Sequence, residues 1–132
     1  MHEKHVLERV IEAIEVLLEV KYFRSSEQVA IELIFLKFSK SDVYIYFNQE
    51  DDTLFVDQRH PQISEELSQF MPHKIWEGAY GQHIRWYWNM VNNQGYEDGL
   101  QFGFAQDVND NPICLQLIAI ASKISVSSVI DL

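Results

Sequence analysis

The sequence predicts a single α+β domain built on an antiparallel β-meander of about six strands, with an N-terminal helix and a short mid-chain helix. Hydrophobic residues make up 47% of the 132 residues, which suffices for one core without a disulfide or structural metal. Early apolar residues recur at helical spacing, whereas later segments alternate or are rich in β-branched and aromatic residues between polar turns. No linker or internal repeat divides the chain, so residues 1–132 are expected to form one domain.

The N-terminal helix is expected over residues 3–19, where apolar residues recur every three or four positions. Four glutamates mark the opposite face as solvated: Glu8, Glu12, Glu15 and Glu19. From Ile14 onward the apolar residues also alternate with a period of two. A short helix followed by a strand is therefore an open alternative, and the sequence alone does not decide between helix and strand for residues 14–23.

The next segments predict strands and a helix. Residues 29–38 are apolar on both parities, as in a central strand that is covered on both faces. Residues 43–47 and 53–56 are expected to continue the sheet as consecutive hairpins. Residues 61–70 predict the short mid-chain helix, which Pro72 would end.

The C-terminal half predicts further strands, beginning with the alternating residues 84–91. One parity is expected to face the core: Ile84, Trp86, Trp88 and Met90. The other parity would share a polar face with Gln101: Arg85, Tyr87 and Asn89. Strands are also expected over residues 100–104 and 113–121, and the tail could add one more. Cys114, the single cysteine, lies in an apolar run and is expected to be buried.

The charge balance bears on partners and location. Ten Lys and Arg face 20 Asp and Glu, giving a formal net charge of −10. Nucleic acids and anionic membranes attract a cationic surplus that this chain lacks, so neither is expected as a partner, whereas a basic protein is compatible. One cysteine suits a reducing compartment, and neither a signal core nor a run of about 18 apolar residues is found. The expected location is the cytoplasm.

No motif for catalysis, cofactor binding or metal binding is found. The chain lacks H-E-x-x-H, paired C-x-x-C, glycine-rich nucleotide loops and the G-x-S-x-G elbow. Residues 107–111 resemble the start of a calcium loop, but Pro112 and Ile118 stand where such a loop needs Gly and Glu, so a hairpin turn is expected. No catalytic residue, cofactor or metal ligand is assigned.

Two polar segments are candidates for partner contacts. The acidic turn at residues 50–52 carries adjacent carboxylates, which repel one another unless a cation or basic partner is near, although Asp also suits a turn. The segment at residues 85–102 combines a glycine-containing loop with tyrosine and arginine, which are typical interface anchors. The predicted partner contacts are Tyr87, Tyr96, Glu97, Asp98, Asp51 and Asp52. A second predicted set would line a cleft: His83, Arg85 and Asn89.

The same segment follows the pattern W-x-W-x-x-x-N-x-x-G-Y-x-D-G-x-x-F, preceded by an E-D-D-T turn at residues 50–53. The matching positions are Trp86, Trp88, Asn92, Gly95, Tyr96, Asp98, Gly99 and Phe102. In these positions the chain resembles a small family of uncharacterised bacterial proteins. The resemblance implies no established activity. Small acidic proteins of this sort are similar to immunity proteins, which bind and neutralise toxins, and that link is an analogy.

The sequence thus favours a non-enzymatic protein-binding module of immunity type, whose acidic surface steers a basic partner. The alternative is a small enzyme or ligand-binding domain with a polar cleft at the end of the sheet. A structural subunit, or a homodimer joined through sheet edges, is a third reading.

Overall fold

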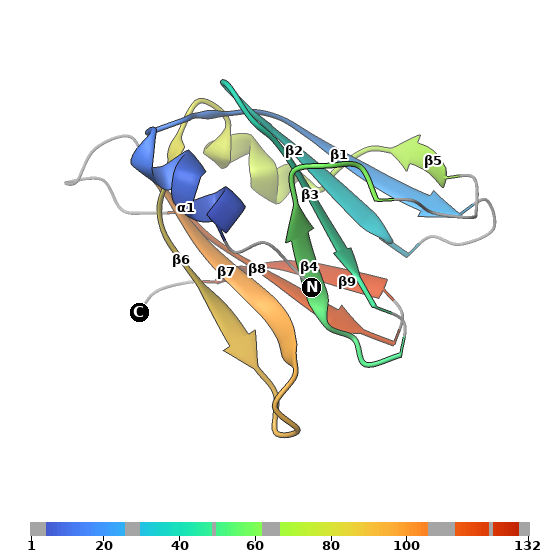
Figure 1. The fold of residues 1–132 in the computed structure, drawn as a ribbon. Helices are drawn as coiled ribbons and strands as arrows, with labels where there is room; N and C mark the ends of the chain where they lie inside the picture. Colours follow the sequence, from blue (N-terminus) through green and yellow to red (C-terminus); the bar gives the residue numbers. More distant parts are fainter. Residues whose placement is uncertain are drawn as a thin grey trace.

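The computed structural model describes residues 5–25, 30–48, 50–61, 67–105, 113–121 and 123–129. They form an α-helix, α1 (His5–Glu12), a 3₁₀ helix, η1 (Lys74–Ala79), and nine strands in two antiparallel sheets (Figure 1). The strands are β1 (Leu17–Ser25), β2 (Leu33–Phe38), β3 (Asp42–Phe47), β4 (Leu54–Asp57), β5 (Leu67–Phe70), β6 (His83–Val91), β7 (Glu97–Ala105), β8 (Ile113–Ile120) and β9 (Lys123–Val129). The antiparallel, β-rich architecture is confirmed, whereas the single meander of six strands is wrong.

The first sheet has five strands in the order β4-β3-β2-β1-β5. β2 lies at its centre and is buried at five of its six positions, which confirms the expected strand covered on both faces. β2, β3 and β4 pair as consecutive antiparallel hairpins, also as expected. The second sheet has four strands in the sequential order β6-β7-β8-β9, so the chain builds it hairpin by hairpin.

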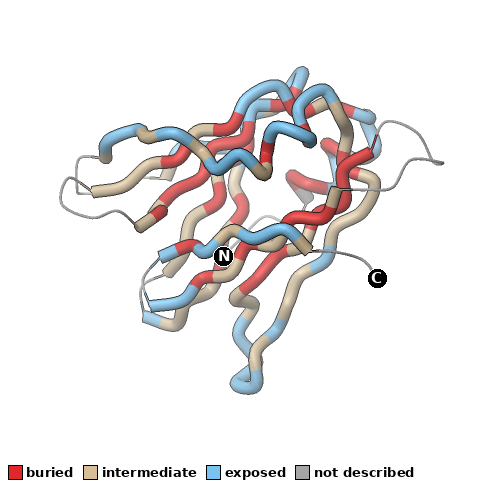
Figure 2. Tube along the Cα trace, turned by 180° about the vertical axis from the view of Figure 1, so that it is seen from behind, coloured by how far each residue is buried: buried red, intermediate tan, exposed pale blue. Residues whose placement is uncertain are grey.

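One hydrophobic core lies between the sheets. It combines residues such as Ile34 and Ile45 from the first sheet with Phe102 and Leu115 from the second, all fully buried. Figure 2 shows the buried stretches running along the inner strands of both sheets. α1 contacts β4 and β6, the edge strands of the two sheets, so its apolar face closes one side of this core. In the described part of the chain, the helices are too short or too polar to cross a membrane.

The N-terminal helix ends earlier than residue 19. α1 stops at Glu12, Ile14 takes a positive φ of 52°, and β1 begins at Leu17. A β-branched residue in that region is incompatible with continuing the helix. In β1, Val20 and Tyr22 face the core, so the period-two alternation wins over the helical spacing. The alternative of a short helix followed by a strand is therefore confirmed.

The mid-chain helix expected at residues 61–70 is wrong in its second half. Leu67–Phe70 form β5, which pairs with β1, while residues 62–66 lie outside the described part of the chain. Phe70 packs edge-on against Tyr22, with ring centroids 5.6 Å apart. Pairing with a free sheet edge is a tertiary interaction that local periodicity does not report. The calcium-like residues 107–111 also lie outside the described residues.

The faces of β6 are the reverse of the expected ones beyond its second residue. The register of β6 on β7 shifts between Ile84 and Trp86, which leaves Arg85 as an extra residue in a β-bulge. Ile84 is fully buried, but Trp88 is 53% exposed and Tyr87 packs against the core. One inserted residue moves every later side chain to the opposite face of the sheet. The expectation that Trp86 and Trp88 point into the core is therefore wrong.

Candidate functional site

The most distinctive described surface is a concavity of about 390 Å³ at one end of the two sheets. We call it the acidic concavity. It is lined by Glu50, Asp51, Asp52, Asn92, Gln94, Tyr96, Asp98, Ala119 and Ile120. These residues belong to the β3–β4 turn, the β6–β7 hairpin and the end of β8. Segments distant in the sequence therefore meet there, and each comes from a different hairpin.

Hydrogen bonds within the β3–β4 turn fix its backbone and the Asp51 carboxylate. The Asp52 amide donates to the Asn48 carbonyl oxygen at 2.9 Å, and the Glu50 amide donates to Asn48 Oδ1 at 2.9 Å. Asp51 Oδ1 accepts from the Thr53 amide at 3.0 Å. Asp52 has a φ of 56°, a conformation that Asp tolerates better than most residues. The turn thus explains part of the acidic composition, as the sequence also allowed.

The opposite wall depends on Asn92. Its Oδ1 accepts from the amides of Gln94 at 2.9 Å and Tyr96 at 3.1 Å, and its own amide donates to the Tyr96 carbonyl oxygen at 2.9 Å. Gly95 takes a φ of 87°, which requires glycine for an unstrained loop. Asn92 and Gly95 therefore have a structural role. Their effect is to hold Tyr96, which is 42% exposed, at the wall of the concavity.

The charges in the acidic concavity are all of one sign. Of the described residues that line it, four carry carboxylates and none is Lys or Arg. Among the described residues, no group of three or more His, Cys, Asp or Glu side chains is arranged to hold a metal ion. Ca²⁺ would need six to eight oxygens at about 2.3–2.6 Å. Carboxylates that are spread over a surface suit an extended cationic partner better than a point charge.

The structure brings four of the predicted contact residues together and separates two. Asp51, Asp52, Tyr96 and Asp98 line the acidic concavity, whereas Tyr87 and Glu97 do not. Their roles as partner contacts all stay predictions. Ala119 and Ile120 also line the concavity. The sequence did not indicate them as site residues, because their pattern is only that of the end of an apolar strand.

The two remaining predicted contacts face other surroundings. The Tyr87 hydroxyl donates to Glu8 Oε1 on α1 at 3.4 Å, and its ring packs against the core. Burial raises the pKa of Tyr87, and the nearby Glu8 carboxylate adds to this effect. Glu97 pairs with Val91 at an irregularity of the β6–β7 ladder, and its Oε2 atom is buried. Neither side chain is well placed to meet a partner together with the acidic turn.

The predicted cleft residues lie along one strand. His83 and Asn89 are six residues apart on β6, which corresponds to about 20 Å in an extended strand. Arg85 is the bulge residue between β6 and β7. Neither the acidic concavity nor the second concavity described below includes any of the three. The geometry does not bring them to one point.

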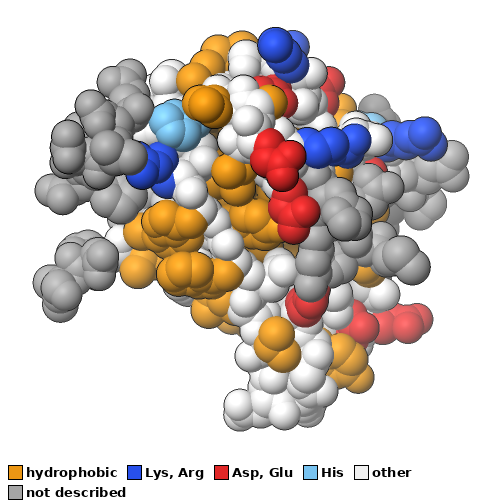
Figure 3. Space-filling view, turned by 60° about the vertical axis from the view of Figure 1, so that its left-hand side comes forward, with side chains coloured by type: hydrophobic (Ala, Val, Ile, Leu, Met, Phe, Trp, Pro, Cys, Tyr) orange, Lys and Arg blue, Asp and Glu red, His pale blue; other side chains and the backbone are white. Residues whose placement is uncertain are grey.

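The outer face of the second sheet carries the two tryptophans that were expected in the core. Trp86 and Trp88 stack with ring centroids 4.3 Å apart. Trp88 Nε1 donates to Gln101 Oε1 at 2.8 Å, and Gln101 Nε2 donates to Gln116 Oε1 at 2.6 Å. A Cβ atom at Gly103 would overlap the Trp86 indole, so glycine lets the ring lie flat on the sheet. Figure 3 shows hydrophobic side chains gathered beside acidic ones on the surface that it presents.

A family model described as a family of unknown function (DUF6334) matches residues 1–131. No curated protein matches, and no solved structure matches. The expected membership of an uncharacterised family is confirmed. These comparisons name no immunity protein as a relative, so the similarity to immunity proteins stays a proposal.

Proposed function

Because the chain belongs to the family of unknown function DUF6334, whose description assigns no activity, we propose a function from the surface itself. The protein is a non-enzymatic binding module that receives a basic segment of a partner protein in the acidic concavity, as an immunity protein covers a toxin. One observation carries this proposal. Four carboxylates and an exposed tyrosine, contributed by separate hairpins, line one concave surface of about 390 Å³.

The carboxylates act mainly on the rate of association. The formal net charge of −10 attracts a basic partner over about 8 Å at physiological salt. Each exposed ion pair adds only about 0.2–1 kcal/mol to the complex, because water screens it and both side chains lose freedom. Acidic residues alone would therefore give a fast but weak complex.

The apolar part of the concavity supplies the affinity that the charges do not. Tyr96 is 42% exposed and Ile120 is 50% exposed, and both line the concavity. Burying such side chains contributes roughly 25 cal/mol for each Å² of apolar surface removed from water. A partner segment that alternates Lys or Arg with an apolar residue matches this lining. A folded basic surface with a projecting loop fits in the same way.

The alternative of a small enzyme or ligand-binding domain has less support, because the residues expected to line its cleft do not lie together. His83, Arg85 and Asn89 are distributed along β6 instead of meeting in a cleft. The proposal also does not need them. We therefore rank protein binding at the acidic concavity first.

A pull-down from the native host at low salt tests the proposal. The full chain is compared with a triple variant, Asp51→Asn, Asp52→Asn and Asp98→Asn, in which Asn keeps the acceptor atom that the β3–β4 turn uses. The control, Glu12→Gln, Glu19→Gln and Glu77→Gln, removes the same charge at exposed positions elsewhere. We expect wild type and control to retain one partner and the triple variant to lose it. No stable partner at low salt, or equal retention by all three proteins, would contradict the proposal.

A further inference from the structure

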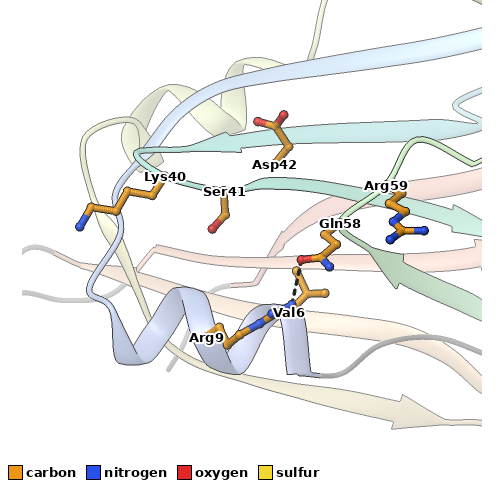
Figure 4. Close-up of a pocket in the computed structure, with 7 residues that line it drawn as sticks. All are labelled: Val6, Arg9, Lys40, Ser41, Asp42, Gln58 and Arg59. Carbon is orange, nitrogen blue, oxygen red and sulfur yellow. Dashed lines mark hydrogen bonds between the residues drawn. The ribbon is translucent and has the colours of Figure 1, made fainter.

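A second concavity, of about 380 Å³, lies at the other end of β3 and β4 and has the opposite charge. We call it the basic pocket. Its polar lining consists of Arg9, Lys40, Ser41, Asp42, Gln58 and Arg59 (Figure 4). Lys40 and Ser41 precede β3 and Arg59 follows β4, whereas the acidic turn joins these strands at their far end. The six residues of β3 separate the two concavities by roughly 20 Å.

We propose that the basic pocket binds a small molecule that carries a phosphate monoester, with Arg9 and Arg59 as the cationic contacts and Lys40 at the rim. Three of the ten Lys and Arg of a chain with a net charge of −10 line this single pocket. In the part of the chain that the structure describes, none of these three side chains forms an ion pair. The described lining residues carry three positive charges and one negative charge, that of Asp42, so the net charge of +2 favours an anion.

The two arginine side chains lie close to Gln58, whereas Lys40 lies apart from them. Figure 4 shows Arg9 on α1 opposite Gln58 and Arg59, whereas the Asp42 carboxylate points away from both arginines. Arg9 Nη2 donates to the neutral Gln58 Oε1 at 2.9 Å, which orients the guanidinium without neutralising it. Lys40 lies at the opposite rim, and its ammonium group points away from both arginines. The positive charge of the two arginines is therefore available to a ligand.

A buried carboxylate holds the Lys40 rim in place. Glu15 is 4% exposed, and its Oε1 accepts from the Lys40 amide at 2.6 Å while its Oε2 accepts from the Ser41 hydroxyl at 2.7 Å. A buried charge is tolerated only when hydrogen bonds replace its hydration, so these bonds fix the β2–β3 turn. Glu15 itself does not line the pocket. On the other side, Asp57 Oδ1 accepts from the Arg59 amide at 3.1 Å.

The chemistry and size of the pocket indicate the ligand class. Guanidinium groups bind phosphate through paired hydrogen bonds, and the net lining charge of +2 balances a phosphate dianion. A volume of about 380 Å³ lies in the range of small-molecule sites. The net charge of −10 repels an extended polyanion such as a nucleic acid, while a ligand that fits inside the pocket meets the local positive potential.

The first test is a titration of the full ¹⁵N-labelled chain with inorganic phosphate at constant ionic strength, with chloride as the comparison anion. We expect saturable shifts centred on the amides of Lys40, Ser41 and Arg59. Arg59→Gln should weaken phosphate binding about tenfold, because it removes a charge-assisted hydrogen bond. The matched control Lys123→Gln removes one exposed positive charge on β9 and should change the affinity less than twofold.

Three outcomes would overturn the proposal. Chloride could produce the same shifts as phosphate, or Lys123→Gln could weaken binding as much as Arg59→Gln, and either result would show general screening. Sedimentation could instead show self-association that phosphate reverses and that Arg59→Gln prevents. That result would assign the basic pocket to the acidic turn of a second copy of the chain. Arg59→Gln is preferred to Arg9→Gln as the test variant, because Arg9 also donates a hydrogen bond to Gln58 and its replacement could alter the fold.

Discussion

We predict that the stability of the protein at alkaline pH depends on the Tyr22 hydroxyl, and that removing this hydroxyl changes the free energy of unfolding by a defined amount. The Tyr22 side chain is fully buried, and its hydroxyl accepts a 2.6 Å hydrogen bond from Trp76 Nε1 in η1. The same oxygen lies 3.2 Å from His73 Nδ1. Burial raises the pKa of Tyr22 from 10.0 to about 12, with the bond from Trp76 opposing part of that rise. In the unfolded chain the phenol titrates near its ordinary value.

The sign and size of the effect follow from these two pKa values. Between pH 10 and about 12 the unfolded chain releases the Tyr22 proton while the folded chain keeps it. The unfolded state then binds fewer protons, so the free energy of unfolding falls with rising pH. The difference of about two pKa units corresponds to about 3 kcal/mol in total. This stabilisation is complete below pH 10 and is lost by about pH 12.

The perturbation is Tyr22→Phe, measured by urea unfolding at several values between pH 8 and pH 12. At pH 8 the variant should be less stable by about 1–3 kcal/mol, because the Trp76 indole N–H is left buried without its acceptor. As the pH rises, the wild type should lose stability faster, so the gap should close near pH 12. Tyr96→Phe, which changes an exposed hydroxyl, is the control. A difference between wild type and Tyr22→Phe that stays constant from pH 8 to pH 12 would refute the reasoning.

Three further predictions concern packing, the basic pocket and the acidic concavity. Gly103→Ala should cost about 1–3 kcal/mol in urea unfolding because its methyl group overlaps a rigid indole, whereas Gly78→Ala meets only the end of a flexible side chain and should cost less; equal costs would contradict this. Glu15→Ala should lower the free energy of unfolding by about 1–3 kcal/mol and speed hydrogen exchange at the Lys40 amide. Unchanged exchange at that amide would show that the carboxylate does not hold the turn. Tyr96→Ala should lower the affinity for the partner recovered by the pull-down about tenfold, as measured by calorimetry, while leaving the unfolding midpoint unchanged. An unaltered affinity would exclude Tyr96 as an anchor.

Local pattern was sufficient for the elements whose neighbours in space are also neighbours in sequence. The sequence predicted the burial of β2 on both faces, the β2–β3–β4 hairpins and the strands of the second sheet. These were predictable because the two strands of a hairpin are close in sequence and each shows the local residue pattern of a strand. The acidic turn and the glycine-containing loop were also recognisable, since Asp, Asn and Gly have specific roles in turns.

Amino-acid pattern by itself therefore determined the composition of the strands, the excess of negative charge and the residues of the two turns. Only the tertiary structure decided the rest. A single bulge at Arg85 reversed the faces of β6, and pairing with β1 made a strand of Leu67–Phe70. The packing of separate hairpins and α1 gathered carboxylates at one end of β3 and cations at the other. Register and contacts between distant segments depend on the whole chain, so no local window of sequence contains them.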